Sequence, residues 1–136
     1  MKKNESLTEC EPKRKNRFII TFPKEYDIDS WIVNTSTMPK YTNDKWENME
    51  ITFKDPIGYS TSERLYKLVV TKDKSTILTQ FTIDMLDPTG VLVEKWLIGI
   101  QEIISIDFGD LDYSNTDMLN PKIIIKPSYC ILNFKD

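Results

Sequence analysis

The stretch from Phe81 to Tyr113 constrains the fold of this chain more than any other part of it. Its first five residues alternate apolar and polar side chains, which is the period-two pattern of a half-buried strand. The residues Asp87–Gly90 then form a turn sequence, with proline and glycine at the positions where a turn uses them. The run Val91–Phe108 is apolar on both faces. Because one small domain rarely needs two apolar sheet faces, the stretch favours a subunit that buries one face in itself and one against neighbours.

The rest of the chain repeats the period-two pattern in short segments joined by turn residues. Ser60 and Glu63 form a capping box ahead of an apolar stripe, which predicts a helix over 61–72. The polar segment Lys40–Lys45 has the composition of a hairpin tip. We expect strands at about 18–22, 31–37, 49–53, 77–86, 91–98, 100–108, 122–126 and 129–134. The predicted fold is therefore mainly β: a small antiparallel β-sandwich or barrel of seven to eight strands with one flanking α-helix.

A length of 136 residues predicts one domain, which we place at 16–136 after a flexible arm at 1–15. Residues 1–17 carry a net charge of +3 although the whole chain carries −3. This basic segment is either a solvated tail or an electrostatic latch for a neighbouring copy. We expect Cys10 and Cys130 to be reduced thiols. No secretory signal is apparent at the N-terminus, and no apolar run reaches 18 residues, so we expect no membrane insertion.

The residue types argue against catalysis. Histidine is absent, which removes the commonest general base and metal ligand, and no glycine-rich phosphate loop is present. The carboxylates between Asp107 and Asp117 have the oxygens for a calcium site or a glycosidase pair, but an exposed acidic turn explains them more simply. Three tryptophans have the surface to stack on bases or sugars, yet no basic groove surrounds them in the sequence. We expect no catalytic residue, no cofactor and no metal.

Five segments together resemble one protein family. They are Asn16-Arg17-Phe18, Asp55-Pro56, Met85–Gly90, Glu94 with Trp96, and Asp107–Tyr113. In this order and spacing they are similar to the tail tube protein of contractile-tailed bacteriophages, over about residues 16–134. The resemblance implies a structural virion protein, assembled in the host bacterial cytoplasm, whose hexameric rings stack into the hollow inner tube of the tail. It further implies contacts with the tail sheath, baseplate and tail terminator proteins, and passage of tape measure protein and DNA without specific binding.

Two sets of residues follow as candidates for these roles. The subunit-interface candidates are Asp87, Pro88, Thr89, Gly90, Trp96, Asp107, Phe108, Gly109, Leu111, Asp112 and Tyr113. The lumen-facing candidates are Asn48, Glu50, Thr52, Lys54, Gln80, Thr82 and Asp84. We expect the helix to lie on the outside, where a sheath would meet it. The alternatives are a tube-initiating baseplate ring of the same fold and a monomeric β-barrel that binds a small ligand or carbohydrate.

Overall fold

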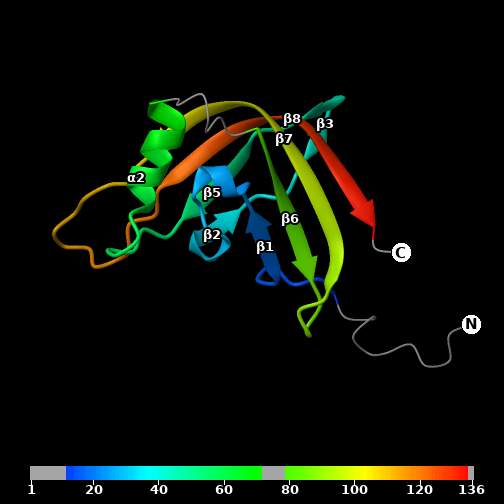
Figure 1. Ribbon diagram of the computed structural model, residues 1–136, viewed down its shortest axis with the longest axis horizontal. Helices are drawn as coiled ribbons and strands as arrows, with labels where there is room; N and C mark the ends of the chain where they lie inside the picture. The colour runs from blue at the N-terminus through cyan, green and yellow to red at the C-terminus, as the bar shows by residue number, and fades with distance from the viewer. Residues whose placement is uncertain (1–11, 72–78, 135–136) are drawn as a thin grey trace, which may run out of the picture.

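The computed structural model describes residues 12–71 and 79–134, and Figure 1 shows their arrangement. Six strands form one antiparallel sheet in the order β1-β6-β7-β8-β5-β2. Their bounds are β1 Phe18–Thr21, β2 Val33–Ser36, β5 Met49–Phe53, β6 Gln80–Leu86, β7 Leu92–Asp107 and β8 Lys122–Phe134. The strands β3 (Tyr41–Thr42) and β4 (Lys45–Trp46) form a separate small hairpin, which confirms the expected tip at 40–45.

The six-stranded sheet curls until its two edges approach each other. The short 3₁₀ turn η2 (Ser30–Ile32) leads into β2, and Ser30 Oγ lies 3.5 Å from Oγ1 of Thr21 at the end of β1. A second 3₁₀ turn, η1 (Lys24–Tyr26), connects β1 to this edge. The sheet is therefore a nearly closed barrel, as the strand-rich sequence predicts, although Trp31 lies in η2 and not in the strand expected from residue 31.

Two pairs of predicted strands are single continuous strands, which corrects the sequence analysis. The segments 91–98 and 100–108 form the 16-residue strand β7, and Pro127 does not interrupt β8. The register of β7 against β8 shifts next to Gly99, Ile100 and Ile103. Such bulges bend a strand without ending it. Pro127 pairs opposite Ile100 within the shifted region, a position where a strand tolerates the missing N–H.

Alternation along the strands places the core on the inner side of the barrel. Met49, Ile51 and Phe53 of β5 are buried, and so are Phe81, Ile83 and Met85 of β6. Ile98, Ile123, Ile125 and Cys130 complete this face from the two long strands. Burying the six side chains of β5 and β6 contributes on the order of 10 kcal/mol before conformational entropy is counted. The intervening residues face the other side of the sheet.

The predicted helix is present and changes its geometry half-way. Helix α2 (Thr61–Leu65) begins at Ser60, whose hydroxyl accepts the N–H of Glu63 at 3.2 Å, as the capping box predicts. It continues as the π-turn η3 (Tyr66–Val70), with the N–H of Thr71 donating to the carbonyl of Tyr66 at 3.2 Å. Leu65 and Leu68 are buried in the core, so the helix covers the inner side of the barrel. None of the helices in the described ranges is long and apolar enough to span a bilayer.

Candidate assembly surfaces

The hairpin tip between β6 and β7 is held by one carboxylate. Oδ1 of Asp87 accepts the N–H of Thr89 at 2.8 Å, the hydroxyl of Thr89 at 2.7 Å and the N–H of Val91 at 2.9 Å. Gly90 has φ of +86°, a conformation that favours glycine. Pro88, Thr89 and Gly90 are exposed, so this tip is a rigid projection at one end of β7.

Trp96 lies on the inner side of the barrel in a polar contact that the sequence did not reveal. Its Nε1 donates to Oε1 of Glu94 at 2.8 Å, and its ring meets Trp46 edge to face at 6.4 Å. Glu94 is only 8% exposed, and Nζ of Lys13 forms an ion pair with its other oxygen. Burial favours the neutral acid, but the bonds from Lys13 and Trp96 outweigh burial and hold the pKa of Glu94 below its usual value. The last residues of the predicted arm therefore rest on the domain.

The segment from Asp107 to Pro121 forms a loop that projects from the opposite end of β7 (Figure 1). Asx-type turns give it a defined shape: Oδ1 of Asp107 accepts the N–H of Gly109 at 2.8 Å, and Oδ1 of Asp112 accepts that of Ser114 at 2.9 Å. The N–H and hydroxyl of Ser114 hold the pKa of Asp112 below its usual value.

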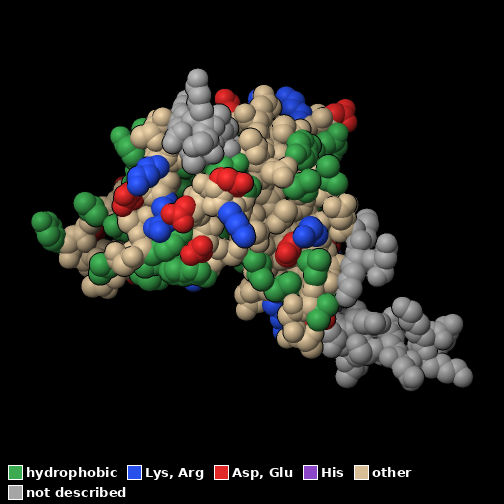
Figure 2. Space-filling view, viewed as in Figure 1, with side chains coloured by type: hydrophobic (Ala, Val, Ile, Leu, Met, Phe, Trp, Pro, Cys, Tyr) green, Lys and Arg blue, Asp and Glu red, His purple; other side chains and the backbone are tan. Residues whose placement is uncertain are grey.

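Large apolar side chains point out of this loop. Leu111 is 88% exposed, Tyr113 112% and Met118 74%, and Phe108 and Leu119 are exposed as well. Figure 2 shows hydrophobic side chains at the outer tip of the loop, away from the body of the barrel. Such a group of exposed apolar residues is typical of an interaction surface.

The interface candidates therefore do not form one surface. The turn at 87–90 and the segment 107–113 lie at the two ends of β7, and Trp96 lies between them on the inner side. Their roles in subunit contacts remain predictions.

The lumen-facing candidates share the side of the sheet that the core does not use. Thr82 and Asp84 of β6 and Glu50 and Thr52 of β5 are half-buried, and the candidates Asn48, Lys54 and Gln80 are exposed. Acidic and basic residues face each other across the strands on this side. Nζ of Lys95 lies 3.9 Å from Oδ1 of Asp84, and Nζ of Lys122 lies 3.4 Å from Oε1 of Glu50. The register also places Glu102 opposite Lys126. The charges in these pairs are matched, and the exposed apolar side chains of Ile19 and Ile131 lie on the same wall.

An unexpected aromatic contact lies on the same wall. Gly99 of β7 pairs with Tyr129 of β8, whose ring covers the glycine, and the Tyr129 hydroxyl donates to Oε1 of Gln80 at 3.3 Å. The sequence signal for this contact is Gly99 itself, because a glycine inside a long apolar strand marks a bulge or a close approach of another group.

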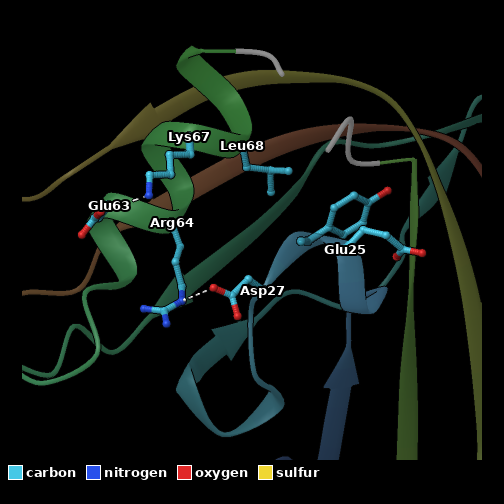
Figure 3. Close-up of a pocket in the computed structure, with 7 residues that line it drawn as sticks. Glu25, Asp27, Glu63, Arg64, Lys67 and Leu68 are labelled. Atoms are coloured by element: carbon cyan, nitrogen blue, oxygen red, sulfur yellow. Dashed lines mark hydrogen bonds and ion pairs between the residues drawn. The ribbon is translucent and has the colours of Figure 1, made fainter. Parts of the chain in front are cut away.

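A charged cleft lies between α2 and η1, and Figure 3 shows the residues that line it. Nε of Arg64 contacts Oδ2 of Asp27 at 3.2 Å, and its guanidinium lies 3.5 Å from the ring centre of Tyr59. Nζ of Lys67 lies 3.1 Å from Oε1 of Glu63. These charges are paired with each other across or beside the cleft. Burial raises the pKa of Tyr59, which leaves it protonated at neutral pH.

Metal-ligating side chains do not cluster in the described ranges. Within residues 12–71 and 79–134, no group of three or more acidic or cysteine side chains is placed to hold a metal ion. Burial raises the pKa of the Cys130 thiol to about 11, so little of the nucleophilic thiolate forms at neutral pH.

Comparison with solved structures identifies the fold of this barrel. No protein-family model and no curated protein matches the chain. A chain from the sheath–tube complex of an extracellular contractile injection system, PVC, in its extended state superimposes with a TM-score of 0.69 at 13% identity, covering 95% of this chain and 96% of the other. The chain has the tail-tube fold.

Two further structures with the tail-tube fold support this assignment. A chain from the tube-terminating cap of the anti-feeding prophage gives a TM-score of 0.67 at 10% identity, over 92% of this chain and 93% of that one. A chain from the baseplate of the same prophage gives 0.56 at 12% identity, over 91% and 97%. The three structures are described as a sheath–tube complex of an extracellular contractile injection system and as the tube-terminating cap and the baseplate of the anti-feeding prophage. The likeness to a contractile-tail tube protein that the sequence suggests is thus confirmed at the level of the fold.

Proposed function

We propose that this chain is a structural subunit whose copies close into hexameric rings, and that these rings stack into the hollow inner tube of a contractile phage tail, the conduit for DNA ejection. The strand edges of the barrel carry this proposal. The segment that ends in β6 pairs with β7 as far as Ile100, whose N–H donates to the carbonyl of Thr79 at 2.9 Å, and β5 pairs with β8 only from Lys122 to Ile125. Within the described ranges, the rest of β7 and the rest of β8 pair with each other along one edge, and their other edges have no strand partner.

Unpaired strand edges of this length favour association with another chain. Among the residues that the structure describes, the free edge of β7 lies beyond Ile100, whereas the free edge of β8 lies beyond Ile125. Because the two edges are different segments, pairing one with the other in a neighbouring copy is a head-to-tail contact, and such a contact closes into a ring when its rotation divides a full circle. Six copies would then share one continuous sheet around a central channel.

The wall of the sheet that the core does not use would line that channel. Its acidic residues are matched by lysines, as in the pairs Asp84 with Lys95 and Glu50 with Lys122. A wall without excess positive charge gives phosphates no fixed counter-charges, so DNA would slide past without being held. In this arrangement α2 would face away from the channel, where a sheath would contact Glu63 and Lys67.

Electron microscopy of the purified chain tests the proposal. We expect six-fold rings and tubes in negative stain, and a sedimentation profile that shifts with protein concentration. Hydrogen exchange gives the residue-level check: amides of β7 beyond Ile100 and of β8 beyond Ile125 should become protected on assembly. Amides between β6 and β7, already paired in one copy, serve as the internal control. A monomer whose exchange pattern does not depend on concentration would contradict the proposal.

Two variants test separately the role of the proposed channel wall and the role of α2. Glu50→Lys adds positive charge to the proposed channel wall and should slow DNA passage while rings and tubes still form. Glu63→Lys makes the same change on α2 and should weaken sheath binding while leaving the tube intact. If Glu50→Lys behaves like Glu63→Lys in both assays, the wall does not face the channel.

The second candidate is a tube-initiating baseplate ring. The superposition on a baseplate chain, with a TM-score of 0.56, favours it as the alternative, although the sheath–tube chain superimposes better. A baseplate ring would form one hexamer and stop, whereas a tube subunit stacks without limit. Tube length against protein concentration distinguishes the two.

A further inference from the structure

A basic groove lies at the end of the barrel where β1 begins. We call it the N-terminal groove; its volume is about 370 Å³, and it is lined by Lys13, Arg14, Lys15, Phe18, Ser36, Met38, Ile83 and Met85. The lining is apolar at its base, where Ile83 and Met85 belong to the core, and basic at its rim. Met38 is 45% exposed, so the groove presents apolar surface to solvent.

The projecting loop at the other end of the barrel has the complementary chemistry. The segment 108–121 contains three aspartates and no lysine or arginine, and Asp107 stands at its base. Leu111, Tyr113 and Met118 extend from it into solvent. Turn hydrogen bonds fix its shape before any contact is made, which lowers the entropy cost of docking.

Both surfaces belong to one chain but cannot meet within it. The groove adjoins the start of β7, because Lys13 of its rim is paired with Glu94. The loop leaves the end of β7 at Asp107. The 16-residue strand β7 separates them, and Figure 1 shows the loop on the left and the start of β1 near the other end of β7. The apolar, acidic loop and the apolar, basic N-terminal groove lie at opposite ends of one copy, so they can contact each other only between two copies.

We propose that the 108–121 loop of one copy docks in the N-terminal groove of a copy in the next ring. This inference rests on the proposed tube, in which the strand edges are used to close each ring and the strand ends are left for contacts between rings. Leu111, Tyr113 or Met118 would enter the apolar base of the groove, and the aspartates would face Arg14 and Lys15 at its rim. Because the contact joins two different surfaces, each docked ring exposes a fresh groove or loop, and stacking continues.

Charge reversal on each surface tests the pairing. The loop variant carries Asp110→Lys and Asp117→Lys, two side chains that make none of the described turn bonds. The groove variant carries Arg14→Glu and Lys15→Glu. A control variant with Glu25→Lys and Glu63→Lys changes the net charge as much as the loop variant does, but beside α2. Thermal unfolding of each full-length variant verifies that it is folded.

The readout is tube length in negative-stain images together with sedimentation. We expect each reversed variant alone to stop at single rings, with a mean tube length at least tenfold below that of the parent chain. The control should stack as the parent does. Mixing preformed rings of the loop variant and the groove variant should restore long tubes, because each reversed surface then meets an opposite charge.

Three results would overturn the inference. Loop or groove variants that stack like the parent would show that this contact is not used, while leaving the tube proposal intact. Variants that stop at rings but are not rescued by mixing would show that the two surfaces do not pair with each other. A parent chain that stays monomeric at every concentration would overturn both this contact and the proposed function.

Discussion

The ring of Tyr129 lies directly on Gly99, so that a β-carbon built on the glycine would meet Cε1 of the tyrosine at 2.2 Å. Gly99→Ala must therefore displace the ring and break its bond to Gln80. Overpacking of this kind costs about 1–3 kcal/mol, against a gain of about 0.5–1 kcal/mol for alanine over glycine in a strand. We expect a net loss of about 1 kcal/mol in the free energy of unfolding, measured by urea denaturation.

The sign should reverse once the ring is removed. In a Tyr129→Ala background, Gly99→Ala should be neutral or stabilising, which makes the two changes strongly non-additive. Gly58→Ala is the matched control, because its β-carbon would have no atom within 4 Å and its φ is not positive. Equal effects of Gly99→Ala in both backgrounds would show that the tyrosine ring does not rest on the glycine.

Asp87→Ala should destabilise the β6–β7 hairpin. The substitution leaves two backbone N–H groups, those of Thr89 and Val91, without the carboxylate that accepts them. We expect a loss of about 1–3 kcal/mol, measured as the change in unfolding free energy, with Asp87→Asn losing less because its amide oxygen still accepts. Asp110→Ala, an exposed aspartate outside the turn bonds, is the control. If both substitutions cost the same, the Asp87 contacts do not stabilise the hairpin.

Trp96→Ala should cost more stability than the same change at Trp31. Trp96 packs on Trp46 inside the barrel and donates to Glu94, whereas Trp31 is 54% exposed. We expect about 2–4 kcal/mol for Trp96→Ala, near the range for large buried aromatics, and a small effect for Trp31→Ala. Thermal unfolding measures stability, and sedimentation shows whether assembly falls with it. Comparable losses at both positions would argue against the inner location of Trp96.

Glu94 should give the protein an acid-sensitive component of stability. Its pKa is lower in the folded chain than its unfolded value of about 4.3, so it contributes stability above that value and loses the contribution as pH falls through the folded pKa. Glu94→Gln should flatten the decline in unfolding free energy below about pH 4, and Lys13→Met should reduce it. Glu25→Gln, at an exposed site, is the control. A decline that is unchanged in Glu94→Gln would show that other carboxylates produce it.

Local patterns predicted most of the elements. The capping box at Ser60, the turn at Asp87 and the alternation of Met49 to Phe53 each depend on neighbouring residues only, and each has the expected form. The predicted break at Pro127 was wrong because its effect depends on the partner strand and not on the neighbouring residues. A proline ends a strand only when the partner strand needs its N–H, and β7 shifts its register opposite this position.

The sequence by itself determined a mainly β chain with one helix, alternating strands and a surplus of apolar strand surface, because these properties follow from the order of side chains along the backbone. Only the tertiary structure decided that Lys13 pairs with Glu94, that Tyr129 covers Gly99, and that the interface candidates separate to the two ends of β7. Such contacts join residues far apart in sequence, and their geometry depends on how far each long strand runs past its partner and how sharply the bulges bend it.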